Sequence, residues 1–367
     1  MDKNTLMISP CGTSLLSNIA VNKERQLLFK YANAQKEEIP DQDIKVLSEV
    51  IQKAKEIVLK ADFRQICSHS AELHAISRYY KLGQNTSDRD IHILLASDTW
   101  IGHETSKIVK SWLEQSFDDV RIEQRKDLAT DKLDFFQSAM ADLVKYFEDL
   151  IPPYRQNGYH IVFNLTGGFK SVQGFLQTLA MFYADEAVYI FQSQDELLRL
   201  PKLPVKLDAR ETIQSHLTLF RKLSRDLSVK KTEMEEIPET FYLNIGNEYC
   251  LSPWGELIWN QTKKEIYGEK VWDEPIAEIV FTDTFKKSVS KLSPDRLYNI
   301  NERIDDLMFF ICDEKNPNRL DFKELSGDPV PGSTHEFDAW ADGAAKRVYC
   351  HIKNECVILD KLDKALH

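Results

Sequence analysis

The stretch HIVFNLTGGFKSVQGFLQTLA (residues 160–180) constrains the fold more than any other part of the chain. It opens on an apolar run rich in β-branched and aromatic residues, which is typical of a strand buried on both faces of a parallel sheet. Gly167 and Gly168 end this strand, and apolar residues then recur at helical spacing. A second strand, expected over residues 187–191, completes a right-handed βαβ unit.

The turn TGGFK of this unit follows a strand and begins a helix, where backbone N–H groups and the helix dipole favour an anion. Lys170 and Ser171 add further donors. The spacing differs from that of a Walker loop and of GxGxxG. The residues alone therefore leave two interpretations open, a phosphate-binding turn and an ordinary turn between strand and helix.

Strand and helix patterns alternate through the first 205 residues. Strands are expected at residues 5–9, 66–69, 91–96 and 120–124, and helices from residue 15 and over 104–113 and 135–150. This alternation predicts an α/β, doubly wound Rossmann-like domain over residues 1–205. Gly12, Thr13 and Ser14 follow the first strand, and the two hydroxyl residues are expected to cap the next helix. They would share a sheet edge with the TGGFK turn.

The prolines of LPKLP (residues 200–204) predict a domain boundary. A helix over residues 208–227, a strand near 241–243 and a helix from Ser252-Pro253 to residue 266 indicate a winged-helix-like linker at 206–274. Residues 275–367 predict a compact α+β domain. Its expected order is a strand at 276–281, helices at 284–292 and 294–311, and strands at 333–340, 347–353 and 355–360.

Composition excludes several classes of function. The net charge of −11 argues against broad electrostatic affinity for nucleic acid. No apolar run approaches the ~20 residues of a membrane span, and no leader pattern is present, so a cytoplasmic protein without a membrane partner is expected. Six scattered cysteines without a CxxC pair predict reduced thiols and no zinc site. Neither a metal nor a cofactor is expected.

Residues 1–205 resemble the CARF family, the CRISPR-associated Rossmann-fold sensors of cyclic oligoadenylate. The matching pieces are SPCGTSLLSN (9–18), CSHSAEL (67–73), LLASDT (94–99) and NLTGGFK (164–170). The resemblance implies a homodimer with cyclic oligoadenylate, cyclic tetra-adenylate first, as allosteric activator on the twofold axis. It implies that phosphates and ribose lie against Gly12, Thr13, Ser14, Thr166, Gly167, Gly168 and Lys170. Adenines would lie near Ser97, Asp98 and Thr99.

The C-terminal ~90 residues resemble RelE-type toxins, which are ribosome-dependent mRNA endoribonucleases. The matching features are the βααβββ order, FKELSGDPVPG (322–332) and AKRVYCHI (345–352). RNA cleavage by its own 2′-OH needs a proton acceptor, a cation for the phosphorane and an acid, but no metal. Lys323, His335, Arg347, Tyr349 and His351 offer the side chains for these roles. The resemblance implies that Lys323, His335 and Arg347 lie at the family's functional positions.

Together the two resemblances imply a type III CRISPR ancillary effector of CARF–RelE type, which inhibits translation by cleaving mRNA on the ribosome. The charge of the C-terminal domain departs from that of free-standing toxins, which are usually basic. Residues 276–367 carry 13 Lys/Arg against 17 Asp/Glu. Such a domain should bind free RNA poorly, which favours an effector that the ribosome positions on its substrate.

Two alternatives remain. RETIQSH contains the R-x5-H spacing of HEPN ribonucleases at Arg210 and His216, although an exposed face of an amphipathic helix explains these residues as well. A second Arg–His pair with a shorter spacing, Arg64 and His69, is expected to lie in a strand. The second alternative is a ligand-responsive regulator that binds DNA through the winged-helix-like linker. The negative charge and the lack of a basic recognition helix argue against it, so no DNA partner is expected.

Overall fold

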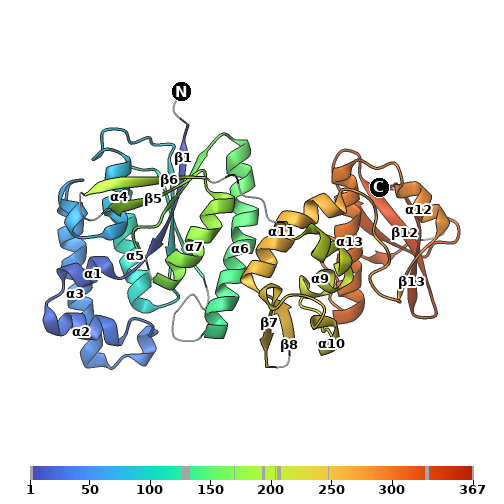
Figure 1. Ribbon diagram of the computed structural model, residues 1–367, viewed down its shortest axis with the longest axis horizontal. Coiled ribbons are helices and arrows are strands. Elements are labelled where there is room, and N and C mark those ends of the chain that lie inside the picture. The colour runs from blue at the N-terminus through green and yellow to red at the C-terminus, as the bar shows by residue number, and fades with distance from the viewer. Residues whose placement is uncertain are drawn as a thin grey trace. The chain divides into compact units, whose positions relative to one another are not determined.

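The computed structural model describes residues 3–125, 133–168, 170–191, 195–202, 204, 208–246, 248–326 and 330–365. The chain forms two compact units, Met1–Lys206 and Leu207–His367 (Figure 1). Some residues of the predicted motifs lie outside the described residues: Phe169 and the side chain of Ser171 near the TGGFK turn, Leu203 of LPKLP, and residues 327–329 of FKELSGDPVPG. In the described parts of the chain, no helix combines the length and apolarity needed to cross a membrane.

The N-terminal unit is built on a six-stranded sheet with the order β3-β2-β1-β4-β5-β6. Its strands are β1 (Thr5–Cys11), β2 (Ile91–Ala96), β3 (Asp119–Gln124), β4 (His160–Asn164), β5 (Glu186–Phe191) and β6 (Glu196–Pro201). All neighbours are parallel except β5 and β6, which are antiparallel. The predicted α/β Rossmann-like fold is confirmed. The strand order reverses between β1 and β4, and this switch point is where such sheets bind ligands.

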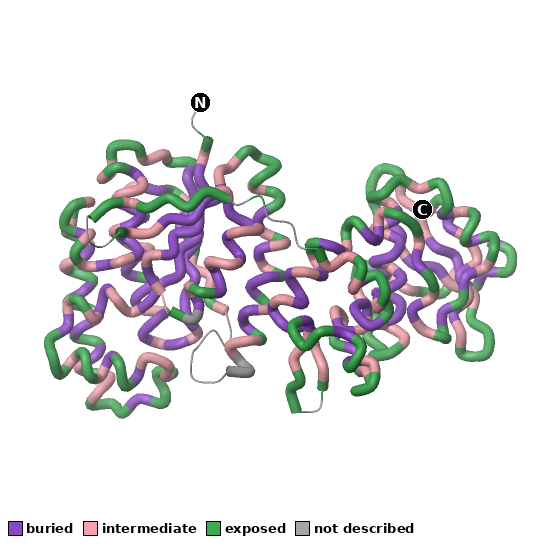
Figure 2. The backbone as a smooth tube through the Cα atoms, in the orientation of Figure 1, coloured by how far each residue is buried: buried purple, intermediate pink, exposed green. Residues whose placement is uncertain are grey.

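Helices cover both faces of the sheet, and the central strands are buried along their length (Figure 2). Successive strand residues point to opposite faces. One face, which includes Met7 and Val162, packs against α1 (Ser14–Ile19), α3 (Asp41–Lys60), α4 (Ala71–Tyr79) and α5 (Trp100–Leu113). On the other face lie α6 (Leu133–Gln156) and α7 (Lys170–Tyr183), where the Phe147 ring is centred 5.3 Å from Phe163.

The structure corrects the prediction of a strand at residues 66–69. These residues form η2 (Gln65–Ser68), a 3₁₀ turn that leads into α4. Asp62 holds the turn, because its Oδ1 accepts hydrogen bonds from the N–H groups of Arg64 and Gln65 at 2.9 and 2.8 Å. A short apolar segment is too brief for its hydrophobic periodicity to distinguish a strand from a turn. The hydrogen bonds to Asp62 explain why this segment forms a turn.

Among the described α-helices and strands of this unit, three were not predicted from the sequence. They are α2 (Asn22–Lys30), α3 and the edge strand β6. β6 ends at Pro201, inside the LPKLP segment that predicted a boundary. Proline is tolerated there because an edge strand has one side without ladder hydrogen bonds.

The C-terminal unit begins with short helices and a hairpin. Its first elements are α8 (Arg210–Ser215), α9 (Leu217–Leu223), α10 (Lys231–Met234), β7 (Tyr242–Ile245), β8 (Glu248–Leu251) and α11 (Pro253–Tyr267). The prediction of one helix over residues 208–227 is wrong, because the chain leaves helical geometry at His216, whose ψ is 33°. Ser252 does cap α11 as predicted, since its Oγ accepts the Gly255 N–H at 2.9 Å.

The rest of this unit follows the predicted order of a strand, two helices and three strands. It comprises β9 (Ile279–Phe281), α12 (Asp283–Val289), α13 (Pro294–Asp313), β10 (Lys323–Glu324), β11 (His335–Trp340), β12 (Lys346–Lys353) and β13 (Cys356–Lys364). The sheet order is β10-β11-β12-β13-β9, and only the β13–β9 pair is parallel. The short strand β10 was not predicted.

A buried polar network joins the linker segment to α13. Arg221 and Asp305 have side chains that are each 1% exposed, and Arg221 Nε donates to Asp305 Oδ1 at 2.5 Å. The Tyr267 hydroxyl donates to the other carboxylate oxygen at 2.5 Å. Asn301 accepts the Trp272 N–H at 3.1 Å. The predicted division at residue 274 thus lies within one compact unit.

A buried histidine in β2 makes the N-terminal unit sensitive to acid. His92 is fully buried, its Nδ1 has no hydrogen-bond partner among the described residues, and burial lowers its pKa to about 3. The unfolded chain takes up this proton near pH 6.5 and the folded chain does not, so stability falls as pH decreases below that value. Between pH 7.5 and 5 this one group should cost about 2 kcal/mol.

Over the same pH interval, the free energy of unfolding of the His92→Leu variant should fall by about 2 kcal/mol less than that of the original protein. Urea unfolding of the full chain, with hydrogen exchange of β1 and β2 amides as the reporter of this unit, measures both slopes. Equal slopes in the two proteins would contradict the assignment.

Candidate functional site

The loops that follow β2, β1 and β4 lie side by side, because these three strands are neighbours in the sheet. All residues predicted to hold a ligand belong to these loops or to the helix after them. The loop after β1 carries Gly12, Thr13 and Ser14; the loop after β2 carries Ser97, Asp98 and Thr99; and the loop after β4 carries Thr166, Gly167, Gly168 and, at its end, Lys170. The fold therefore gathers the predicted residues at one sheet edge, on either side of the switch point.

The loops after β1 and β4 touch through glycine. A Cβ atom on Gly12 would lie 3.1 Å from the Gly168 Cα. Gly168 has a φ of +93°, and a Cβ there would lie 2.8 Å from the Pro10 ring. Only glycine fits this conformation and contact without a shift of the backbone, so packing of one loop on the other explains Gly168 of the TGGFK turn.

Two amide side chains fix the loop after β4. Asn164 donates to Ser9 Oγ at 3.2 Å and to the Glu72 carbonyl at 3.0 Å. From within α7, Gln173 donates to the carbonyls of Leu165 and Gly167 at 3.1 and 2.7 Å. These bonds hold the turn against its own helix and against α4.

A buried carboxylate lies beneath the loop after β1. Glu72, in the first turn of α4, is fully buried, and its Oε1 accepts the Gly12 N–H at 2.9 Å. Its Oε2 accepts from the hydroxyls of Ser14 at 3.1 Å and Ser70 at 2.7 Å. Thr13 occupies the N-cap position of α1, but its hydroxyl makes no capping bond, contrary to the prediction. Glu72 was not among the predicted residues.

The hydroxyls of Ser97 and Thr99 serve the start of α5. They are buried and lie 3.0 Å apart, and Thr99 Oγ1 accepts the Gly102 N–H at 3.1 Å. A Cβ on Gly102 would lie 2.0 Å from Ser97 Oγ, so these three residues form a tight cap. Asp98, between them, is the more exposed member of the loop.

Lys170 is the exposed first residue of α7, a 14-residue helix. Within the described ranges its ammonium group has no ion-pair partner. A cation at a helix N-terminus adds to the positive end of the dipole, and the two together favour an anion at this edge of the sheet.

Residues 67–203 match the model of a family described as CRISPR-associated protein (Cas_APE2256). The match supports a CRISPR-associated protein. The matched range begins just before Glu72 and includes the loops after β2 and β4. No curated protein matches the chain.

The candidate effector residues lie in the C-terminal sheet, where Arg347, His351 and Lys323 each have a carboxylate partner. Arg347 on β12 pairs with Glu336 and, through Nε at 3.1 Å, with Asp338 on β11. His351 Nδ1 lies 2.9 Å from Asp360 Oδ1. Lys323 pairs with Asp321. Tyr349 is buried, its hydroxyl donates to the Lys364 carbonyl at 2.8 Å, and burial raises its pKa.

The strand register separates His335 from Arg347. In the ladder of β11 and β12, His335 is opposite Cys350 and Asp338 is opposite Arg347. Cys350 belongs to the buried core, and the His335 ring stacks on Phe322 with centroids 5.3 Å apart. Arg347 and Tyr349 therefore share one face of the sheet, while His335 lies at the edge of the opposite, core-facing side.

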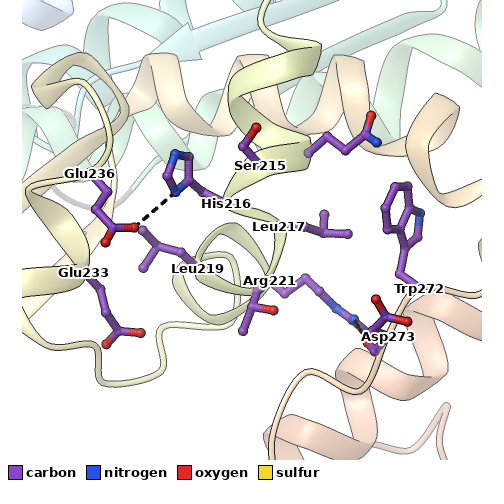
Figure 3. A pocket seen from close by; sticks show the side chains of 11 residues that line it. Ser215, His216, Leu217, Leu219, Arg221, Glu233, Glu236, Trp272 and Asp273 are labelled. Carbon is purple, nitrogen blue, oxygen red and sulfur yellow. Dashed lines mark hydrogen bonds and ion pairs between the residues drawn. The ribbon is translucent and has the colours of Figure 1, made fainter.

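The R-x5-H pair of the HEPN alternative is divided between different partners. Arg210 Nη1 pairs with Glu265 at 2.6 Å, and its Nη2 pairs with Glu269. His216 instead lines a cavity of about 350 Å³, where its Nδ1 lies 3.5 Å from Glu236 Oε2 (Figure 3). Nothing in this arrangement directs both side chains to one phosphate.

Proposed function

We propose that the N-terminal unit is a sensor of cyclic oligoadenylate, with cyclic tetra-adenylate as the first candidate. The observation that carries this proposal is the convergence of three loops from the neighbouring strands β2, β1 and β4 at the switch point. The helix N-terminus with Lys170 supplies positive charge there. The family match of residues 67–203 supports a role in CRISPR systems.

A cyclic ligand with an even number of phosphates has a twofold axis, so two copies of one site can hold its two halves. We therefore propose a homodimer formed by the N-terminal units, with one ligand bound per two chains. Preassembly of this dimer avoids the entropic cost of joining two half-sites around the ligand.

Lys170→Ala is expected to weaken binding of cyclic tetra-adenylate at least tenfold without unfolding the chain. A charged hydrogen bond to phosphate contributes about 1.5–3 kcal/mol, and the dimer contains two copies. Titration calorimetry measures both the affinity and the ratio of one ligand to two chains.

Lys107→Ala is the matched control, because Lys107 is an exposed lysine of the same unit whose ammonium pairs with Glu104 at 2.8 Å. It should bind like the unaltered protein. Failure of the unaltered protein to bind the ligand would overturn the proposed sensor; equal binding by Lys170→Ala would assign the TGGFK turn a structural role only.

For the C-terminal unit we propose a ligand-activated, ribosome-dependent mRNA endoribonuclease. The observations in favour are the order of a strand, two helices and three strands, and the presence of Arg347 and Tyr349 on one sheet face. Arg347 would stabilise the phosphorane charge after exchanging its carboxylate partners for the phosphate. His351, also on β12, would serve in proton transfer.

A further inference from the structure

Glu72 is an anion buried inside a site that the proposed function assigns to another anion. Its carboxylate is fully buried and accepts the three hydrogen bonds from Gly12, Ser14 and Ser70. In the part of the chain that the structure describes, no lysine or arginine pairs with it. Charge-assisted hydrogen bonds of this kind offset the cost of removing a carboxylate from water.

Both loops of the switch point rest on this carboxylate. A Cβ on Gly167 would lie 2.2 Å from the carboxyl carbon of Glu72, so the loop after β4 packs directly against it. The loop after β1 is tied to it by the Gly12 N–H and the Ser14 hydroxyl. Gly12 and Ser14 thus bond to an acceptor that follows them in the chain by 60 and 58 residues.

We propose that Glu72 is a positioning residue, which sets the distance between the two loops and so places the ligand donors; this inference rests on the proposed sensor function. Glu72 also separates the groups predicted to bind the ligand into those that it already bonds and those that it leaves unbonded. The Gly12 N–H and the Ser14 hydroxyl are occupied by Glu72. The Thr13 hydroxyl and the Lys170 ammonium have no hydrogen bond or ion pair within the described residues. These two groups remain available to contact phosphate.

The test compares Glu72→Ala with Glu72→Gln in the full-length protein, with cyclic tetra-adenylate as the probe. Alanine removes all three bonds, and we expect at least tenfold weaker binding by calorimetry. Glutamine keeps the shape of the side chain. Its amide oxygen can accept the Gly12 N–H, and its amide nitrogen can donate to the two serine oxygens. We therefore expect glutamine to restore affinity to within about threefold of the original protein.

Glu186→Ala is the matched control. Glu186 is 9% exposed, bonds to His160 and Arg199, and begins β5, at the sheet edge opposite the ligand loops. Thermal melting should show losses of stability for both alanine variants, whereas affinity should fall only for Glu72→Ala. A role confined to stability would leave affinity unchanged in both variants.

The outcomes are distinguishable. If the unaltered protein does not bind the ligand, the sensor function and this inference both fail. If it binds and Glu72→Ala binds equally well, only the positioning role is overturned. Should Glu72→Ala not fold, Ser70→Ala removes one of the three donors and leaves both ligand loops unaltered. It should weaken binding about threefold, and unchanged affinity in that variant would overturn the inference.

Discussion

Asp305→Ala is expected to destabilise the C-terminal unit by about 3–5 kcal/mol, the usual effect of removing one partner of a buried ion pair. Asp305 is 1% exposed, and Arg221 and Tyr267 both donate to its carboxylate. Burial raises the pKa of Asp305, and the charge of Arg221 opposes that rise. Without the carboxylate, the guanidinium of Arg221 remains buried and uncompensated. In the parts of the chain that the structure describes, its Nη2 already has no hydrogen-bond partner.

Denaturant unfolding with hydrogen exchange of α13 amides measures this effect in the full chain. The matched control is the double variant Arg221→Met with Asp305→Leu, which replaces both charges with apolar groups. Such replacements of a buried pair are often neutral, so the double variant should be more stable than Asp305→Ala. A loss below about 1 kcal/mol for the single variant would show that the pair does not hold the linker segment to α13.

Much of the N-terminal unit was predictable because its central strands β1, β2 and β4 are buried on both faces. The predicted strand at residues 91–96 matches β2 at both ends, since an apolar run that only His92 interrupts lies between Asp90 and Ser97. The TGGFK turn was recognisable because the strand before it and the helix after it have different hydrophobic periods.

The organisation of the site was not predictable in the same way. Glu72 accepts hydrogen bonds from Gly12 and Ser14, 60 and 58 residues earlier in the chain, and local sequence carries no sign of such distant partners. A sequence signal did exist, because this glutamate lies within the otherwise uncharged motif CSHSAEL at a helix start, but Ser70 alone explains a cap there.

The effector residues show a second limit of sequence reasoning. Strand alternation correctly puts Arg347 and Tyr349 on one face, because both lie on β12. The face of His335 depends on the register between two strands, which the sequence of β11 alone does not fix. The register also brings Glu336 and Asp338 against Arg347, and a bulge near Tyr349 leaves Asp360 free of a ladder partner and within reach of His351.

Arg347→Ala should reduce ligand-activated cleavage of ribosome-bound mRNA by about 10²–10⁴-fold. An arginine remains charged at any working pH, so it can stabilise a phosphorane throughout the reaction. Its side chain is 16% exposed on the sheet face that also carries Tyr349. Ligand binding by the N-terminal unit should not change. Primer extension on translating mRNA measures cleavage, and calorimetry measures ligand affinity.

Removal of Arg347 leaves the carboxylate of Glu336, 6% exposed, without its cation, so folding must be controlled separately. Combining Arg347→Gln with Glu336→Gln removes both charges and should keep the fold while cleavage is still lost. Arg296→Ala removes another paired arginine of the same unit, bonded to Asp342 at 2.6 Å, and should cleave at the full rate.

The remaining comparison separates the interpretations of the C-terminal unit. His335→Ala should retain more activity than Arg347→Ala, because the register puts His335 on the other side of the sheet. His216→Ala should retain full activity, since His216 lies by Glu236 in a separate cavity. If His216→Ala is inactive while Arg347→Ala cleaves normally, the RelE-like mechanism is wrong and the HEPN-type alternative replaces it. If Arg347→Ala is the only one of these variants to lose activity, the scissile phosphate is assigned to the sheet face on which Arg347 lies.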